Sequence, residues 1–183
     1  MAIYLSLFRA INIGGNSKVS MAALKELHEA LGLCNVATYL QTGNVVFESP
    51  ETDPAKLAAQ LKKEFGQRFG FETEVMVRTA AELKEVFNKN PFLNQPAKEP
   101  KWVLVLFLAS RPADQDIEAL LKAYDGPEEL HVIGCELYAY YTNGIGRSKL
   151  TNAYIEKKLK TLGTGRNWNT VTKLLEMTGV QVG

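Results

Sequence analysis

Residues 35–47 read NVATYLQTGNVVF and predict a β-hairpin. Asn35 to Leu40 and Asn44 to Phe47 are short runs rich in β-branched and aromatic residues, which favour strands. Between them, Gly43 can adopt the positive φ that a tight turn requires. The hairpin therefore supplies two adjacent antiparallel strands, and the neighbouring elements can be assigned around it.

The residues before the hairpin predict one strand and one helix. Residues 2–9 are apolar and β-prone, as is typical of a strand. Ser20 can cap a helix, because its hydroxyl can accept a hydrogen bond from a free backbone N–H of the first turn. Gly32 is expected to end that helix, at a position where a left-handed backbone is favoured.

The residues after the hairpin supply a second helix and a fourth strand. Asp53 and Pro54 provide an N-cap and a proline at the first helical position, and residues 72–78 predict a strand. The order β-α-β-β-α-β is that of the ferredoxin-like arrangement. Residues 79–82 (TAAE) form a capping box for a short helix, so this subdomain is expected to span residues 1–92.

Residues 93–183 predict a second α+β subdomain, which we expect to form one structural unit with the first. Residues 102–108 are almost continuously apolar, as expected for a centre strand buried on both faces. A helix from about Pro112 and a hairpin within residues 129–142 follow.

The end of the chain predicts two helices. Ser148 is expected to cap the first, which Gly163 ends, and the last starts near Asn167. A helix therefore stands where the final strand of a second ferredoxin-like unit would be.

The composition excludes several classes of protein. The chain has 183 residues, 46% of them hydrophobic, and a net charge of +1, which gives no global argument for nucleic acid or membrane. No signal peptide is recognised, and no apolar run approaches the roughly 20 residues that cross a bilayer. Cys34 and Cys135 lie far apart and outside any C-x-x-C pair. We therefore expect a cytoplasmic protein without a disulfide, metal or cofactor.

Charge is distributed unevenly along the chain. Residues 146–175 contain seven basic residues and one acid, whereas residues 110–136 contain two basic residues and seven acids. Solvated helix faces explain each run in the simplest way. The two runs could also pair between subunits, which would give a homo-oligomer.

Three glycine-containing segments combine cations with predicted helix starts. They are residues 9–18 (RAINIGGNSK), 144–149 (GIGRSK) and 164–168 (TGRNW). Backbone N–H groups of such loops and helix N-termini attract anions, and arginine can hold a phosphate or carboxylate with paired donors. Turns that need glycine for geometry alone, together with helix capping, explain the same segments without a ligand.

We predict one anion-binding site in which these segments converge with polar residues of the first half. Its members are Arg9, Asn12, Gly14, Gly15, Lys18, Gln41, Asn44, Ser148, Lys149, Arg166 and Asn167. The prediction requires the three segments to lie close together within one chain or across a subunit interface.

Five motifs occur in the order in which one bacterial family has them. They are residues 7–18, residues 38–47, Asn90-Pro-Phe92, residues 148–150 and residues 164–170. Over essentially its whole length the chain resembles the family called domain of unknown function 1697. The resemblance implies an α+β fold of two intertwined ferredoxin-like subdomains with C-terminal helices, and no established activity, substrate or cofactor. Thr42 stands where a serine is expected, and the hydroxyl is kept.

The residues favour binding over catalysis. His28 and His131 are the two histidines, and both lie outside the glycine-containing motifs. Residues 44–47 lack the aromatic pattern with which RNA-recognition motifs stack bases. We predict a binding protein for an anionic ligand, which could be a nucleotide, a phosphorylated metabolite or a nucleic-acid backbone.

Two alternatives remain open. In an enzyme acting on a phosphorylated or acyl substrate, Arg166, Lys149 and Arg9 would stabilise developing negative charge. In a structural or assembly protein, the same motifs would only fix the fold or the oligomer.

Overall fold

The computed structural model describes residues 1–13 and 18–182. The chain divides into two compact units: unit 1 comprises Met1–Glu85 and Lys173–Gly183, and unit 2 comprises Val86–Thr172. Each unit contains one four-stranded sheet whose paired strands are all antiparallel. With six α-helices among the described residues, this confirms the predicted α+β class.

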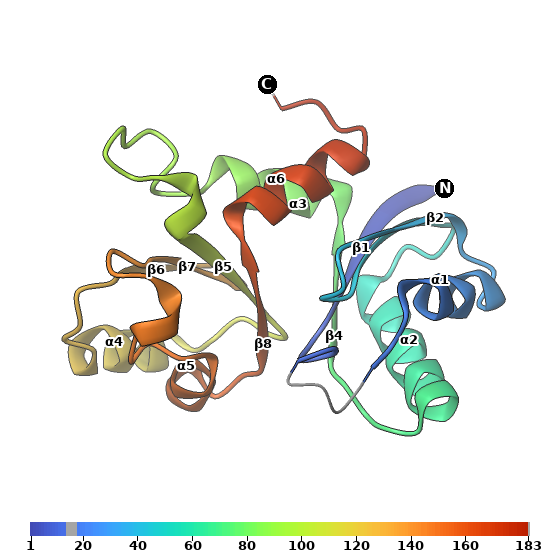
Figure 1. The fold of residues 1–183 in the computed structure, drawn as a ribbon, viewed down its shortest axis with the longest axis horizontal. Coiled ribbons are helices and arrows are strands. Elements are labelled where there is room, and N and C mark those ends of the chain that lie inside the picture. The colour runs from blue at the N-terminus through green and yellow to red at the C-terminus, as the bar shows by residue number, and fades with distance from the viewer. Residues whose placement is uncertain (14–17, 183) are drawn as a thin grey trace. The chain divides into compact units, whose positions relative to one another are not determined.

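Unit 1 is built around a sheet with the strand order β2-β3-β1-β4. Its elements are β1 (Ala2–Phe8), α1 (Met21–Ala30), β2 (Cys34–Tyr39), β3 (Asn44–Ser49), α2 (Pro54–Phe69), β4 (Val75–Thr79) and the start of α3 (Ala80–Asn88). The predicted order β-α-β-β-α-β and the β2–β3 hairpin are confirmed. Helices α1 and α2 cover one face of this sheet (Figure 1).

The helices of unit 1 begin where the capping residues predict. The Ser20 hydroxyl accepts a hydrogen bond from the Ala23 N–H at 3.1 Å, and the Asp53 carboxylate accepts one from the Ala55 N–H at 2.9 Å. At the start of α3, Thr79 and Glu82 exchange side-chain to backbone hydrogen bonds of 2.8 and 3.0 Å. These contacts satisfy backbone donors that a helix start leaves free.

The core of unit 1 contains one polar pair. His28 and Ser6 are both fully buried, and the His28 Nε2 lies 2.9 Å from the Ser6 Oγ. The His28 Nδ1 lies 2.7 Å from the Leu24 carbonyl oxygen, so Nδ1 carries the proton and the Ser6 hydroxyl donates to Nε2. Phe8 and Phe47 pack against the ring. Because both residues are completely buried, we assign this pair a structural role in the core of unit 1.

Unit 2 has a sheet with the strand order β6-β7-β5-β8. Its elements are the end of α3, the 3₁₀ turn η1 (Pro100–Trp102), β5 (Val103–Leu108), α4 (Asp114–Ala123), β6 (Glu129–Ile133), β7 (Glu136–Tyr140), the 3₁₀ turn η2 (Ile145–Arg147), α5 (Asn152–Leu159), β8 (Gly163–Asn167) and the start of α6 (Trp168–Met177). Strand β5 lies inside the sheet, as predicted, and α4 and α5 cover one face (Figure 1).

The predicted absence of a final strand in the second half is wrong. Residues 163–167 form β8, which pairs antiparallel with β5, so unit 2 also has the order β-α-β-β-α-β. Glycines weaken the strand signal in this sequence, but packing requires one of them. A Cβ at Gly163 would lie 2.9 Å from the Leu106 Cγ, so only glycine fits there without displacing Leu106. Arg166 therefore lies in a strand rather than at a helix start.

The predicted cap of the penultimate helix is also wrong. Thr151, not Ser148, caps α5, and its hydroxyl accepts a hydrogen bond from the Tyr154 N–H at 3.2 Å. The Ser148 hydroxyl instead accepts from the Leu150 N–H at 3.0 Å, which folds a turn before the helix. This leaves Ser148 and Lys149 in the wall of a cavity.

Candidate functional site

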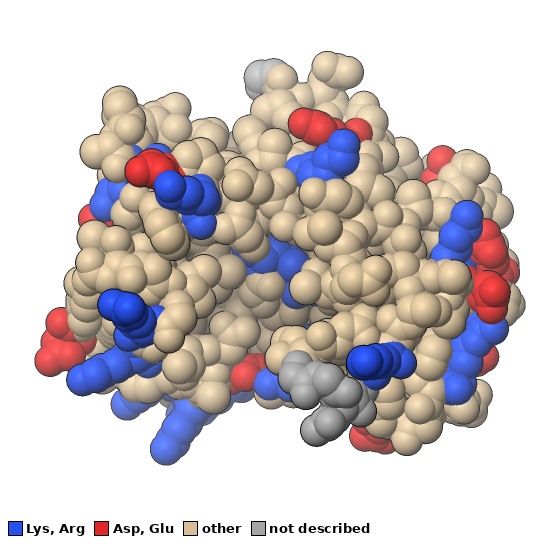
Figure 2. Space-filling view, in the orientation of Figure 1, with Lys and Arg blue, Asp and Glu red and all other residues tan. Residues whose placement is uncertain are grey.

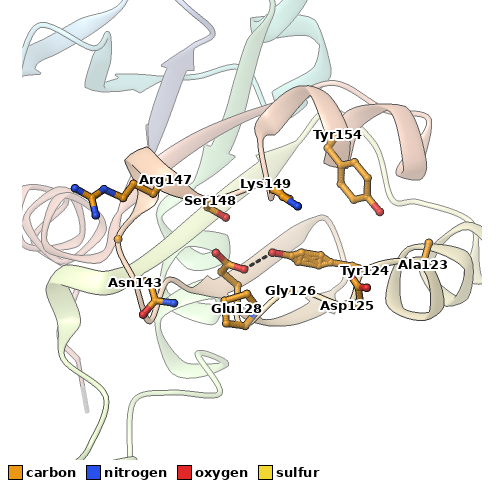
Figure 3. A pocket seen from close by; sticks show the side chains of 12 residues that line it. Ala123, Tyr124, Asp125, Gly126, Glu128, Asn143, Arg147, Ser148, Lys149 and Tyr154 are labelled. Atoms are coloured by element: carbon orange, nitrogen blue, oxygen red, sulfur yellow. Dashed lines mark hydrogen bonds between the residues drawn. The ribbon is translucent and has the colours of Figure 1, made fainter.

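Unit 2 contains a cavity of about 580 Å³ between two loops. One wall is formed by the last residue of α4, Ala123, and by residues 124–128 (Figure 3). The other wall is formed by residues 143, 144, 147–149 and 154. Its volume lies within the range of about 300 to 1,000 Å³ that small-molecule sites occupy.

The first wall is shaped by a glycine that follows a tyrosine. Helix α4 ends at Ala123, and the Tyr124 ring lies across Gly126 so closely that a Cβ at Gly126 would collide with it. The turn then returns the chain so that Glu128 precedes β6. As a result, the Tyr124 hydroxyl donates a short hydrogen bond to the Glu128 carboxylate.

The second wall is fixed by two buried residues. The buried Tyr141 hydroxyl donates to the Leu150 carbonyl at 2.9 Å, and the Leu150 side chain enters the core of unit 2. Because Leu150 is anchored, the residues just before it are held at the cavity. Tyr154, in the first turn of α5, contacts the Tyr124 ring edge-on with centroids 6.0 Å apart.

Glu128 is the buried charge of the cavity, with 7% of its surface exposed. Burial alone would raise the pKa of its carboxyl, but hydrogen bonds from the Ser148 and Tyr124 hydroxyls outweigh burial and lower the pKa below its ordinary value. Burial and the same carboxylate raise the pKa of Tyr124 to about 12. Glu128 is therefore an ionised hydrogen-bond acceptor at neutral pH and a weak base.

Two cations of the second wall are solvent-exposed. Within the described part of the chain, neither Arg147 nor Lys149 forms an ion pair, and Glu128 has no cationic partner. In Figure 3 the Arg147 guanidinium points away from the Glu128 carboxylate, whereas Lys149 lies above the Tyr124–Glu128 hydrogen bond. Of the two cations, Lys149 is thus the better oriented to bind a ligand in the cavity.

The cavity adjoins a basic stretch of surface. The charged side chains visible over α5 and the segment before it are mostly Lys and Arg (Figure 2). In the sequence, Lys157, Lys158 and Lys160 follow the two cations of the cavity. The acid of this stretch, Glu156, is buried and accepts a hydrogen bond from the Gly163 N–H at 2.9 Å. Lys160 forms an ion pair with Asp116 of α4 at 3.1 Å, so the net positive charge there comes from Lys157 and Lys158.

Three predicted site residues of unit 1 line a separate hollow of about 410 Å³. They are Asn12, Lys18 and Gln41. The Asn12 side chain accepts from the Val19 N–H at 2.7 Å and donates to the carbonyl oxygens of Val19 at 2.8 Å and Gln41 at 2.7 Å. Its amide therefore ties two loops together. Gly14 and Gly15 lie outside the described residues.

Replacing Asn12 by aspartate tests this structural role. The carboxylate keeps the acceptor for Val19 but loses two donors and faces two carbonyl oxygens, so Asn12→Asp is expected to lower the free energy of unfolding by about 2 kcal/mol. Denaturation curves measure it. Gln41→Ala is the control, because only the main chain of Gln41 takes part, and it should change little. Unchanged stability in Asn12→Asp would contradict the structural role.

The other two predicted site residues of unit 1, Asn44 and Arg9, also form hydrogen bonds within the fold of that unit. Asn44 is fully buried, and its amide donates to the Tyr39 carbonyl at 2.7 Å and the Thr42 hydroxyl at 2.9 Å. This explains why a hydroxyl is kept at residue 42. Arg9 follows β1 and is half-buried, and its backbone N–H donates to the Glu74 carbonyl at 3.0 Å.

Of the predicted site residues in unit 2, Ser148 and Lys149 line the cavity, but Arg166 and Asn167 are not among its lining residues. Arg166 is 6% exposed and donates to the Thr164 hydroxyl at 2.6 Å, and burial lowers the pKa of its guanidinium to about 10. The Asn167 side chain accepts from the Asn169 N–H at 2.9 Å at the start of α6 and donates to the Lys101 carbonyl at 2.8 Å.

Three residues of the cavity were missed from the sequence: Tyr124, Glu128 and Tyr154. Tyr124 and Tyr154 lie outside the three glycine-containing segments, and Glu128 belongs to an acidic run that a solvated surface also explains. Only the Gly126-Pro127 turn signals that the chain reverses between Tyr124 and Glu128. Arg147 was part of a quoted motif without being assigned to the site.

Residues 1–13 and 18–182 contain neither a cluster of potential metal ligands nor a helix that could span a membrane. No group of three or more His, Cys, Asp or Glu side chains is arranged there to hold a metal ion. Nor does any helix in that part of the chain combine the length and apolar character needed to cross a membrane.

Comparisons with known proteins identify a family and a fold. The model of the family described as "Protein of unknown function (DUF1697)" matches residues 1–138, which include the first wall of the cavity but not the second. The conserved bacterial protein SP0830 from Streptococcus pneumoniae has a similar structure, with a TM-score of 0.73, 22% sequence identity, and coverage of 97% of this chain and 98% of that one. A comparison with curated proteins finds no match. The chain belongs to the DUF1697 family of proteins of unknown function.

Proposed function

We propose that the protein binds a small anionic ligand in the cavity of unit 2, with Lys149 as the principal cation and Arg147 beside it. The observation that supports this most directly is that both cations border a cavity and neither forms an ion pair with a described residue. Lysines elsewhere in the chain do form such pairs, as Lys62 does with Glu74 and Lys98 with Glu129.

Several features of the cavity suit a small polar ligand. Exposed cations on neighbouring residues can bind phosphate or carboxylate oxygens by charge-assisted hydrogen bonds. The exposed amide of Asn143 adds a donor on the same wall. The surrounding surface over α5 is basic and raises the local concentration of anions. The ring of Tyr154 provides an apolar surface for the body of the ligand.

A binding role fits the chemistry of Glu128 better than acid–base catalysis does. A carboxylate with a lowered pKa is a poor proton acceptor at neutral pH, because general bases work best with a pKa near the working pH. The Ser148 hydroxyl accepts a hydrogen bond from the Leu150 N–H at 3.0 Å, which holds it in the turn before α5.

Titration with ethyl phosphate, followed by amide chemical shifts at low ionic strength, tests the proposal. The resonances of residues 143–149 are expected to shift in wild type, and Lys149→Ala should weaken binding about tenfold, which is the loss of one charge-assisted hydrogen bond. Lys157→Ala removes the same charge from α5 outside the cavity wall and is the matched control. Equal weakening by both variants, or no shift at the cavity in wild type, would overturn the proposed site.

A further inference from the structure

We infer that the ligand of this cavity is bipolar: it carries an ammonium group for Glu128 in addition to the anionic group for Lys149. This inference rests on the proposed function and narrows its ligand to the class of small amino acids and amino-alkyl phosphates. The inference is drawn from the burial of Glu128, its place in the cavity wall and its hydrogen-bond partners.

Glu128 is an unusual group to find in an anion site. It is 93% buried, lies within the same cavity as Lys149, and forms no ion pair with a described residue. A buried charge without a counter-charge is unfavourable, because few water dipoles reach it. The hydrogen bonds outweigh this cost and keep the carboxylate ionised, and a cation arriving with the ligand would supply the opposite charge that no described residue places beside it.

The carboxylate also has room for a further donor. A carboxylate offers about four acceptor positions. The Tyr124 hydroxyl takes one of them, and the other two donors that lower the pKa of this carboxyl, the Ser148 hydroxyl and the backbone N–H of Glu128, take at most two more. At least one position is left for a group that enters the cavity, and an ammonium group can fill it with an N–H while adding the missing positive charge.

The charges of the lining agree with such a ligand. The cavity is lined by two cations, Arg147 and Lys149, and by two carboxylates, Asp125 and Glu128, so that its formal charge is zero. A purely anionic ligand would be attracted by one wall and repelled by the other. A ligand with both charges can satisfy both walls, and Figure 3 shows the carboxylate of one wall facing the wall that carries Lys149.

Matched ligand pairs test the inference in the intact protein. The probes are 2-aminoethyl phosphate and 3-aminopropyl phosphate, each compared with the hydroxyalkyl phosphate of the same chain length. At neutral pH and low ionic strength, we expect at least one amine to bind wild type about tenfold more tightly than its hydroxyl counterpart. In Glu128→Gln the side-chain shape and an acceptor oxygen remain while the charge is lost, and the preference for the amine should disappear. Glu118→Gln, which removes the same charge from the exposed face of α4 outside the cavity lining, is the control and should keep the preference.

The possible outcomes of this experiment distinguish the proposed anion site from the inferred bipolar ligand. If amine and hydroxyl bind wild type equally and Lys149→Ala weakens both, the bipolar ligand is excluded and the anion site stands. If none of the phosphates shifts the resonances of the cavity, both the anion site and the inference fail. If the amine is preferred in wild type and equally in Glu128→Gln, Glu128 is not the partner of the ammonium group. Because wild type alone gives the preference, the test does not depend on the folding of Glu128→Gln.

Discussion

Gly43→Ala is expected to lower the free energy of unfolding by about 3 kcal/mol, whereas Gly32→Ala should lower it by only about 1 kcal/mol. Both glycines have a positive φ, 86° for Gly43 and 78° for Gly32, so alanine is strained at either position. Only Gly43 lacks space: its added Cβ would lie 2.6 Å from the Ile11 Cδ1 and 2.9 Å from the Phe8 Cβ, while Gly32 has nothing within 4 Å.

Denaturation of the two variants and wild type, followed by circular dichroism, measures the difference. The strain of the positive φ is common to both variants, so the extra loss in Gly43→Ala reports the packing of the hairpin turn on Phe8 and Ile11. Losses of equal size would show that these two side chains move aside without cost, and the close packing at this turn would then be wrong.

The stability of the protein is expected to fall by about 2 kcal/mol between pH 7 and pH 5 because of His28 alone. Burial lowers the pKa of His28 to about 4, and the hydrogen bond of its Nδ1 to the Leu24 carbonyl opposes this only in part. The unfolded chain, in which histidine has a pKa near 6.5, takes up a proton in this range while the folded chain does not. Stability is therefore complete above about pH 6.5 and is lost as the pH falls towards 4.

Free energies of unfolding at pH 7, 6 and 5 measure this dependence. His28→Gln removes the titrating group, and the variant should lose much less stability over the same range, whatever its stability at pH 7. His131→Gln is the control and should keep the wild-type dependence, because His131 is exposed on the edge strand β6. An identical pH dependence in wild type and His28→Gln would contradict a buried, neutral His28.

Local signals predicted unit 1 well because each of its boundaries is fixed by short-range chemistry. Ser20 and Asp53 cap helices through atoms two or three residues away, and Gly43 takes its positive φ within the hairpin itself. Such contacts are encoded within a few residues, so the sequence carries them directly.

The last strand of unit 2 could not be predicted in this way. Gly163 and Gly165 lower the strand propensity of β8, and their reason for being there is the space left by Leu106 and Leu104 on a strand more than 50 residues earlier. A pattern that depends on such a distant neighbour resembles a loop when it is considered alone. The same limit explains why Ser148 resembled a helix cap.

Only part of the candidate site was predicted from the sequence, because some of its contacts also join residues that are distant in the chain. Ser148 and Lys149 were found because glycines and cations mark their loop, and both line the cavity. The partners Tyr124 and Glu128 lie about twenty residues earlier and reach Ser148 only when the two loops fold against each other. Buried pairs between loops leave no periodic signal in a sequence.

The passage of the chain through the two units also has a consequence for its synthesis. Residues 173–183 complete unit 1, although the whole of unit 2 stands between them and the rest of that unit. A ribosome therefore delivers every residue of unit 2 before the last piece of unit 1 leaves the exit tunnel. Unit 1 therefore has its full set of residues only after all of unit 2 has been synthesised.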